Sequence, residues 1–223
     1  MLISTVVSQS KSSLWPFLLT TGMLVSITIP SEVSAHDIWI VANTYRLGPT
    51  EGVSVFINNG DFFPESSFLL GRHRVKDFFV YEGDSRREIQ NLKKKDHSLE
   101  VLLSPNAGGI QILALSVQPR VVRLRSAEFT DYLEENGLVD VLDLRERLGE
   151  SDEAAMERYS KWAKAIIEVA SSESGASNQL WSESIGHTLE IVPRKNPYRM
   201  RAGEVLPVTV FFKGKPVSGV TIK

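Results

Sequence analysis

The segment VKDFFVYEGDSRREIQNLKKKDHSLEVLLSPNAGGIQILALSVQP (residues 75–119) decides the fold class of this chain. It contains short runs of strand-favouring residues, and the turn-forming stretches EGD, KKKD and PNAGG separate these runs. We expect strands at VKDFFVYE (75–82), REIQNL (87–92), SLEVLLS (98–104) and GIQILALSVQP (109–119). Short strands joined by tight turns are typical of antiparallel sheets rather than of β-α-β units. The segment therefore predicts an antiparallel sheet structure.

The stretch upstream of this segment continues the same pattern. It contains the candidate strands DIWIV (37–41), VSVFI (53–57) and SFLLG (67–71). The intervening NNGD (58–61) has the composition of a hairpin turn. A series of about seven short strands with turns at this spacing indicates a sandwich. We therefore predict a mainly β fold, an antiparallel β-sandwich of the Ig-like or carboxypeptidase-regulatory-like type, over residues 36–125.

The periodicity changes after residue 125. One helix is expected over residues 126–137, from a capping serine to a terminating glycine, and a second over 139–149. A third and longest helix is expected over 151–169, because apolar side chains follow helical spacing there. These side chains are Ala155, Tyr159, Trp162, Ile166 and Val169. Together the three helices predict an α-helical insertion over residues 126–172.

Strand signals return near the C-terminus. Residues 173–185 form a polar linker in this interpretation, and a second β-module is expected over 186–223. Its strands are HTLEIVP (187–193), EVLPVTVFF (204–212) and PVSGVTIK (216–223). Three strands seldom form an independent sandwich, and the last of them runs to the end of the sequence. We therefore expect this second module to be incomplete.

The composition excludes several classes of function. The 223 residues carry a formal net charge of −2, so nucleic acid is a poor partner. The chain has no cysteine, which excludes disulfides, thiolate metal sites and cysteine nucleophiles. A metal site would have to use histidine, carboxylates, backbone groups or water.

The N-terminal 35 residues have the pattern of an export signal. The uncharged run LWPFLLTTGMLVSITIP (14–30) is followed by SEVSA, in which Val33 and Ala35 are the small residues that a signal peptidase reads. We therefore predict a signal peptide over residues 1–35 and a periplasmic mature protein. The alternative is an uncleaved membrane anchor, although the run is short for a membrane-spanning helix.

Cleavage after Ala35 would make His36 the first residue of the mature chain. Its free amine and its imidazole both lose protons near neutral pH, so together they can chelate one metal ion. The alternative is that His36 is a solvated terminal residue without a ligand.

Several separated stretches resemble one family. AHDIWI comes first, VSVFINNGDFFPES follows, then the helical EFTDYLEENGL and ERYSKWAKAI, and finally GHTLEIVP with GEVLPVTVFFKGKPVSGV. In this order they resemble a bacterial family of exported domains of unknown function associated with nickel or cobalt uptake. The resemblance implies a periplasmic protein that binds nickel or cobalt and acts beside a membrane metal transporter. By position it draws attention to His36 and His187.

The chemistry of the four histidines allows a closer assignment. His73 and His97 lie among basic residues, which disfavour a cation, so we interpret both as solvated. The predicted metal site therefore uses His36 and His187, with Asp37 as a ligand or as the partner that orients the imidazole. Glu190 is a further carboxylate that could complete the site. His187 has a competing interpretation, a hydrogen bond to a loop carbonyl.

No catalytic motif accompanies these residues, so we do not expect an enzyme. The serines lack the surroundings of a nucleophile, and the paired glutamates of the first predicted helix have no catalytic context. Two alternatives to metal uptake remain open. One is a structural or protein-interaction β-sandwich of the cell envelope without metal function. The other is a copper redox enzyme that uses an N-terminal histidine.

Overall fold

The computed structural model describes residues 3–6, 36–171 and 179–222. From His36 onward the chain divides into two compact units. Unit 1 comprises residues 36–119 and 160–223, and unit 2 comprises residues 120–159. The fold is mainly β, with several antiparallel sheets and two α-helices among the described residues, as predicted.

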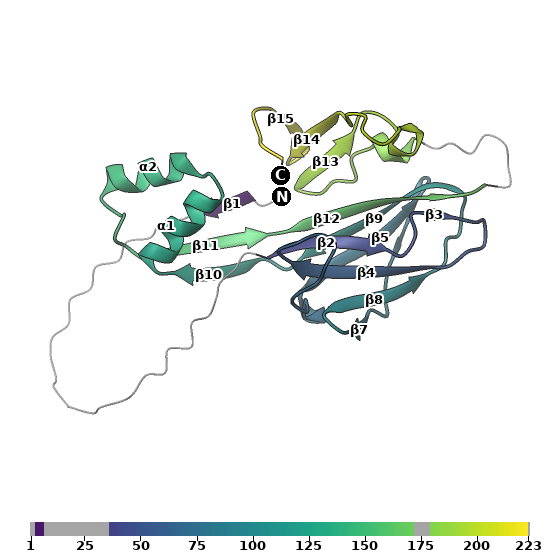
Figure 1. Ribbon diagram of the computed structural model, residues 1–223, viewed down its shortest axis with the longest axis horizontal. Helices are drawn as coiled ribbons and strands as arrows, with labels where there is room; N and C mark the ends of the chain where they lie inside the picture. The colour runs from purple at the N-terminus through teal and green to yellow at the C-terminus, as the bar shows by residue number, and fades with distance from the viewer. Residues whose placement is uncertain (1–2, 7–35, 172–178, 223) are drawn as a thin grey trace, which may run out of the picture. The chain divides into compact units, whose positions relative to one another are not determined.

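Two sheets of unit 1 form a sandwich (Figure 1). The first sheet has the order β2 (Asp37–Ala42), β4 (Val53–Gly60), β8 (Ser98–Leu103) and β7 (Lys93–Lys95). The second has the order β3 (Arg46–Leu47), β12 (Trp162–Val169), β9 (Gly109–Val117), β5 (Val75–Glu82) and β6 (Ser85–Glu88). All pairings are antiparallel except that of β3 with β12, which is parallel.

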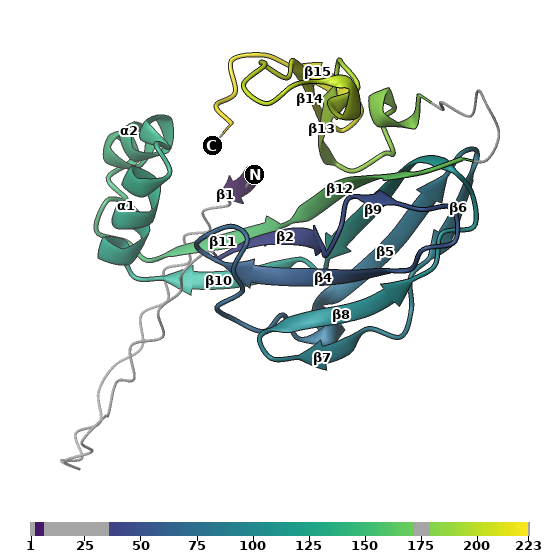
Figure 2. The same cartoon turned by 45° about the vertical axis from the view of Figure 1, so that its right-hand side comes forward.

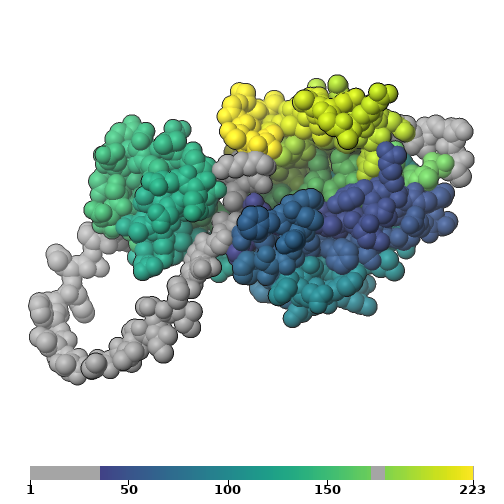
Figure 3. All heavy atoms as spheres, viewed as in Figure 1, coloured from purple at the N-terminus to yellow at the C-terminus, as the bar shows by residue number. Residues whose placement is uncertain are grey.

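The core of the sandwich lies between these two sheets. Val53, Val55 and Ile57 alternate along β4 and are fully buried, because every second residue of a strand points to the same face. Leu113 and Ile167 belong to the same apolar cluster from the opposite sheet. The space-filling view shows β2 to β8 as one continuous packed body (Figure 3). Packing between two apolar faces thus accounts for the predicted sandwich.

The C-terminal part of unit 1 is a three-stranded antiparallel sheet (Figure 2). Its order is β13 (Leu189–Pro193), β14 (Val208–Phe212) and β15 (Lys215–Val217), and the short 3-10 helices of the unit are η1 (Arg72–Arg74), η2 (Leu180–Ser182) and η3 (Pro197–Arg199). Leu180 packs with Ile166 of β12 in a second apolar cluster. The Tyr198 hydroxyl lies 2.7 Å from the carbonyl oxygen of Ile166, and burial raises the pKa of this phenol. The first two predicted C-terminal strands are confirmed with shorter bounds, whereas β15 shares only residues 216–217 with the strand expected over 216–223.

Unit 2 contains both α-helices. It consists of β10 (Arg120–Leu124), α1 (Ser126–Glu135), α2 (Val139–Leu148) and β11 (Ala155–Ser160), and β11 lies between β10 and the N-terminal β1 (Ile3–Val6) in its sheet. Phe129 and Leu133 of α1 are fully buried. Arg145 is also buried: its guanidinium donates to the Glu153 carbonyl oxygen at 2.7 Å and lies over the Phe129 ring. The first two predicted helices are therefore confirmed.

The third predicted helix, over residues 151–169, is wrong. These residues form β11 and β12, and β12 is an interior strand between β9 and β3. Both faces of β12 are covered, so apolar residues can occur on either face of this strand. Ile167 packs in the core of the sandwich, whereas Ile166 packs in the second cluster with Leu180. Because β12 is buried on both faces, its apolar residues have a spacing that resembles that of a helix. Within the predicted insertion, α-helices occur only between residues 126 and 148.

Three local predictions also differ from the structure. Residues 58–60 of the expected NNGD turn continue strand β4, and a Cβ on Gly60 would lie 3.1 Å from the backbone nitrogen of Ser67. Gly60 therefore does not form a turn. Its lack of a side chain allows the loop at Ser67 to pack closely against the end of β4. Residues 67–71 form part of that loop and not a strand, while the strand expected over 87–92 ends at Glu88.

Two further observations complete the fold. Residues 172–178, which include the first six residues of the predicted linker, lie outside the described residues, as does nearly all of the predicted signal peptide. Among the residues that the structure describes, we find no helix with the length and hydropathy of a membrane span.

Candidate functional site

His36 stands at the start of strand β2, opposite Asp61. The antiparallel register of β2 with β4 pairs Asp37 with Gly60, so one step further along the same ladder brings residue 36 beside residue 61. The imidazole Nδ1 of His36 lies 2.9 Å from Oδ1 of Asp61. Since an ionised carboxylate only accepts, Nδ1–H is the donor of this hydrogen bond.

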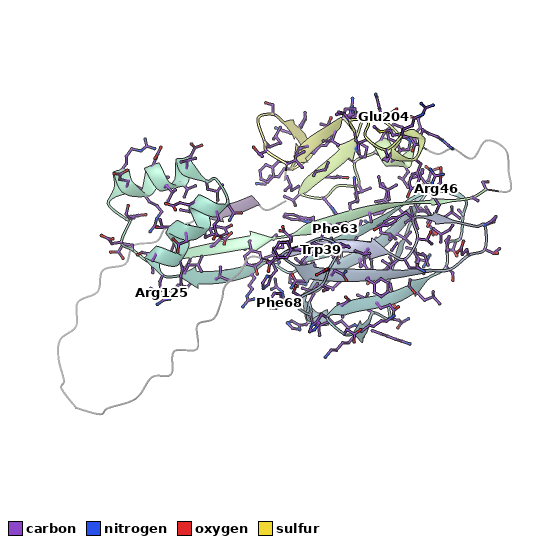
Figure 4. All side chains as sticks on the ribbon, viewed as in Figure 1. Trp39, Arg46, Phe63, Phe68, Arg125 and Glu204 are labelled. Carbon is purple, nitrogen blue, oxygen red and sulfur yellow. The ribbon has the colours of Figure 1, made fainter. Side chains whose placement is uncertain are left out.

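Other contacts fix the position of His36. Its ring stacks on Phe68, with 3.7 Å between the ring centroids and 18° between the planes. Its backbone carbonyl oxygen accepts a hydrogen bond from the ammonium group of Lys161, a buried residue just before β12. Figure 4 shows Phe68 and Trp39 at the same end of β2. The ring is thus held on one side by an aromatic face and on its Nδ1 edge by a carboxylate.

Asp37, which we predicted as a ligand, is exposed and forms the first residue of β2. Successive side chains of a strand point to opposite faces, which separates the Asp37 carboxylate from the His36 ring. The carboxylate that the structure brings to the His36 imidazole is that of Asp61.

His187 lies in a pocket of about 300 Å³ within unit 1. The pocket is lined by Trp162, Lys164, Ile166, His187, Leu189, Glu190, Ile191, Pro193, Leu206 and Val208. Most of this lining is apolar. Its charged groups are Lys164 from β12 and Glu190 from β13, whose Nζ and Oε1 atoms are 2.7 Å apart.

The Glu190 carboxylate is almost fully buried and well supplied with donors. Besides Lys164, it accepts from the Ser184 hydroxyl at 2.7 Å and from the backbone N–H groups of Ile185 and Gly186. Burial alone would raise the pKa of Glu190, but the Lys164 and Ile185 hydrogen bonds outweigh it and hold this pKa below its usual value. The loop before β13 is therefore built around an ionised carboxylate.

His187 is half-buried beside this ion pair. Burial lowers the pKa of His187, the charge of Lys164 acts in the same direction, and the charges of Glu190 and Asp77 oppose them. The environment therefore favours the neutral imidazole, the form that can coordinate a metal ion or exchange a proton.

The structure does not join the two histidines in one cluster. The neighbours of His36 are Asp61, Phe68 and the Lys161 ammonium, whereas those of His187 are Glu190 and Lys164. Within the described ranges no group of three or more His, Asp or Glu side chains has the arrangement of a metal site. In a chain that begins at His36, the terminal amine would be an additional nitrogen ligand that does not come from a side chain.

Asp61 and Lys164 are the residues that the sequence reasoning missed. The sequence pattern predicts a turn at Asp61 and a helix at Lys164. The signal that could have found Asp61 is the register of the first hairpin, because two antiparallel strands that pair Ala42 with Val55 also place His36 opposite Asp61.

Comparison with known proteins identifies the family. No curated protein and no solved structure matches the chain. One family does match residues 33–223, which include both candidate sites and all described elements except β1. This chain therefore belongs to the family described as Domain of unknown function (DUF4198).

Proposed function

We propose that this protein is an exported, periplasmic metal-binding protein that takes up nickel or cobalt outside the cytoplasmic membrane and acts beside a membrane transporter. The metal ion is its cargo, and no catalytic role is assigned. The observation that carries the proposal is the 2.9 Å separation between Nδ1 of His36 and Oδ1 of Asp61.

The chemistry of the His36–Asp61 pair supports a metal ion as its ligand. A chain that begins at His36 offers its terminal amine and its Nδ1 atom, which can bind one ion in a single chelate ring. Asp61 supplies a carboxylate oxygen at that same nitrogen. Two nitrogens and one carboxylate form a donor set that suits divalent nickel or cobalt without any thiolate. The ion would replace the proton that Nδ1 now shares with Asp61.

The stacking of His36 on Phe68 supports the same assignment. A ligand whose ring is already fixed loses little conformational freedom when the ion binds. The Lys161 ammonium holds the His36 carbonyl and so orients the start of the chain. His187 is not needed for this donor set, since its neighbours are Glu190 and Lys164.

Titration calorimetry with Ni²⁺ and Co²⁺ tests the proposal, on protein whose N-terminal residue has been identified as His36 by mass spectrometry. We expect one ion per chain, with affinity that rises with pH because the ion competes with protons for nitrogen donors. Asp61→Asn should weaken binding, because a neutral amide replaces the anionic oxygen donor of the proposed site. His36→Ala should remove the site.

The matched control is His187→Ala, which removes an imidazole outside the proposed donor set and should leave the affinity unchanged. The proposal fails if the protein with a free His36 amine binds Ni²⁺ no more tightly than His36→Ala. That result would favour the alternative, a structural or protein-interaction sandwich of the envelope. Tighter binding of Cu²⁺ would not contradict the proposal, because copper outcompetes nickel at almost any nitrogen site.

A further inference from the structure

A surface of unit 1 beside His36 exposes several large apolar side chains. Phe62 is 76% exposed, Phe63 68% and Phe68 43%, and Leu69 follows at 36%. We call these four residues the aromatic edge. All of them belong to the loop that connects β4 with η1. One short segment therefore exposes four large apolar side chains, three of them aromatic, to water.

The loop that carries the aromatic edge is fixed by hydrogen bonds. The carbonyl oxygen of Pro64 accepts from the Trp39 indole N–H at 3.1 Å and from the Asn58 side-chain amide at 2.8 Å. The Glu65 N–H closes a turn onto the Phe62 carbonyl oxygen at 2.9 Å. The Phe63 ring meets the Trp39 ring edge to face, and Figure 4 shows the two side by side. Because the backbone is held on both sides of Pro64, the exposure of Phe62 and Phe63 is a built feature of the fold.

We propose that the aromatic edge docks onto the interfacial region of a phospholipid bilayer, with Phe62 and Phe63 entering between the headgroups. Transfer of phenylalanine side chains out of water is favourable, and the carbonyl oxygens of Phe62 and Pro64 already accept hydrogen bonds within the protein. These two carbonyl groups therefore need no new partner when the loop enters the interface.

The size of the surface favours a bilayer over a protein partner. From the exposed fractions and the usual area of an aromatic side chain, the aromatic edge presents on the order of 400 Å². A stable protein interface needs about 800 Å² from each partner. A bilayer sets no such requirement, because it surrounds each inserted side chain with apolar or interfacial groups.

The position of the loop in the chain points to the same partner. The apolar run of residues 14–30 ends shortly before His36, so at most about 20 Å of extended chain separates them. His36 stacks on Phe68 of the aromatic edge. A leader that is still in the membrane when the sandwich has folded would hold the aromatic edge close to that membrane. This second argument rests on the export that is part of the proposed function, whereas the argument from exposed area does not.

The charges around the aromatic edge are nearly balanced. Asp61 and Glu65 lie on the loop itself, and Arg72 follows it in η1. The exposed Lys93 and Lys94 lie on β7, in the hairpin whose His97 carbonyl oxygen accepts from Ser66 of the loop at 2.7 Å. Apolar contact should therefore drive docking, and anionic lipid should not be required.

A fluorescent label on the full chain tests this proposal. The chain has no cysteine, so Leu69→Cys creates a single attachment point for an environment-sensitive nitrobenzoxadiazole dye. With phosphatidylcholine vesicles, we expect increased emission and quenching by nitroxide groups on the acyl chains. Leu102→Cys is the matched control, since Leu102 is an exposed leucine on β8 outside the aromatic edge. A dye at residue 102 should show neither effect, even though both proteins carry the same N-terminal segment.

The double substitution Phe62→Ser and Phe63→Ser in the Leu69→Cys protein should abolish the quenching. Both side chains are largely exposed, so thermal unfolding should confirm that the variant keeps its fold. Equal quenching at residues 69 and 102, or quenching that survives the double substitution, would overturn the proposal. A dye response to solubilised envelope proteins but not to vesicles would also overturn it, in favour of a protein partner. Calorimetry with Ni²⁺ reports on His36 separately, so the two proposals can fail independently.

Discussion

At the scale of single residues, the environment of His187 makes a specific prediction about pH. Burial lowers the pKa of His187 in the folded protein below the ordinary value of 6.5. Between these two values the unfolded chain binds more protons than the folded one, so the free energy of unfolding falls as the pH falls. Stability should therefore decline as the pH drops below 6.5, and His187→Gln should reduce this decline. Urea unfolding across this pH range measures it.

The control for this prediction is His97→Gln, which removes an exposed imidazole and should leave the decline unchanged. Glu190 does not contribute to the loss of stability in this pH range. Its pKa is lowered from 4.5, so its own contribution is present above that value and is lost only at lower pH. If His187→Gln and the original protein lose stability equally below pH 6.5, the half-buried ring has no energetic role in folding.

At the scale of elements, the end of helix α2 depends on one residue. Gly149 caps the helix with φ 67°, a left-handed conformation that side chains with a Cβ disfavour. A Cβ at this position would meet no neighbouring atom, so the cost of Gly149→Ala comes from the backbone alone. We expect a loss of about 1 kcal/mol, seen as faster amide hydrogen exchange in α2.

Gly48→Ala provides the comparison for that substitution. Gly48 has no left-handed φ, and its added Cβ would lie 3.6 Å from the nearest atom, an ordinary contact. Its effect should stay within about 0.5 kcal/mol, as for most surface substitutions. Equal effects of the two variants would show that the cap does not depend on the glycine.

The elements also show which features the sequence could predict. Strands with one buried face, such as β5 and β8, have alternating patterns and were predicted with nearly correct bounds. Strand β12 was missed because it is covered on both faces, and its apolar residues then lose the alternation that distinguishes a strand from a helix. For the same reason, the sequence does not predict Lys164 of β12 as a residue of the candidate site.

The candidate site also contains residues that the sequence could predict and one that it could not. His36, His187 and Glu190 were chosen for their chemistry, which the sequence displays directly. Asp61 depends on the register of β2 with β4, and a register is a property of pairing between segments. A one-residue difference in the assumed turn is enough to remove Asp61 from the neighbourhood of His36.

At the scale of the whole molecule, the two units have separate cores. The cluster of unit 2 consists of residues such as Leu124, Phe129 and Leu133, and both clusters of unit 1 lie entirely outside residues 120–159. Strands β9 and β12 of unit 1 pair with each other up to the point where the chain leaves for unit 2. Trp162 pairs with Ser116, and the Val117 N–H donates to the Lys161 carbonyl oxygen.

Residues 120–159 should therefore be removable as one piece. We expect a chain in which Asn-Gly replaces residues 119–159 to fold. Continued by two residues, the register of β9 with β12 places Gln118 opposite Ser160, so a two-residue turn between them closes an antiparallel hairpin, and no buried residue of unit 1 is lost. Its far-ultraviolet circular dichroism should lose the helical signal, and its thermal unfolding should remain a single cooperative transition. Its affinity for Ni²⁺ should match that of the complete protein and should again depend on His36. If the shortened chain does not unfold cooperatively, the sandwich requires unit 2, and the separation of the two cores does not amount to independent folding.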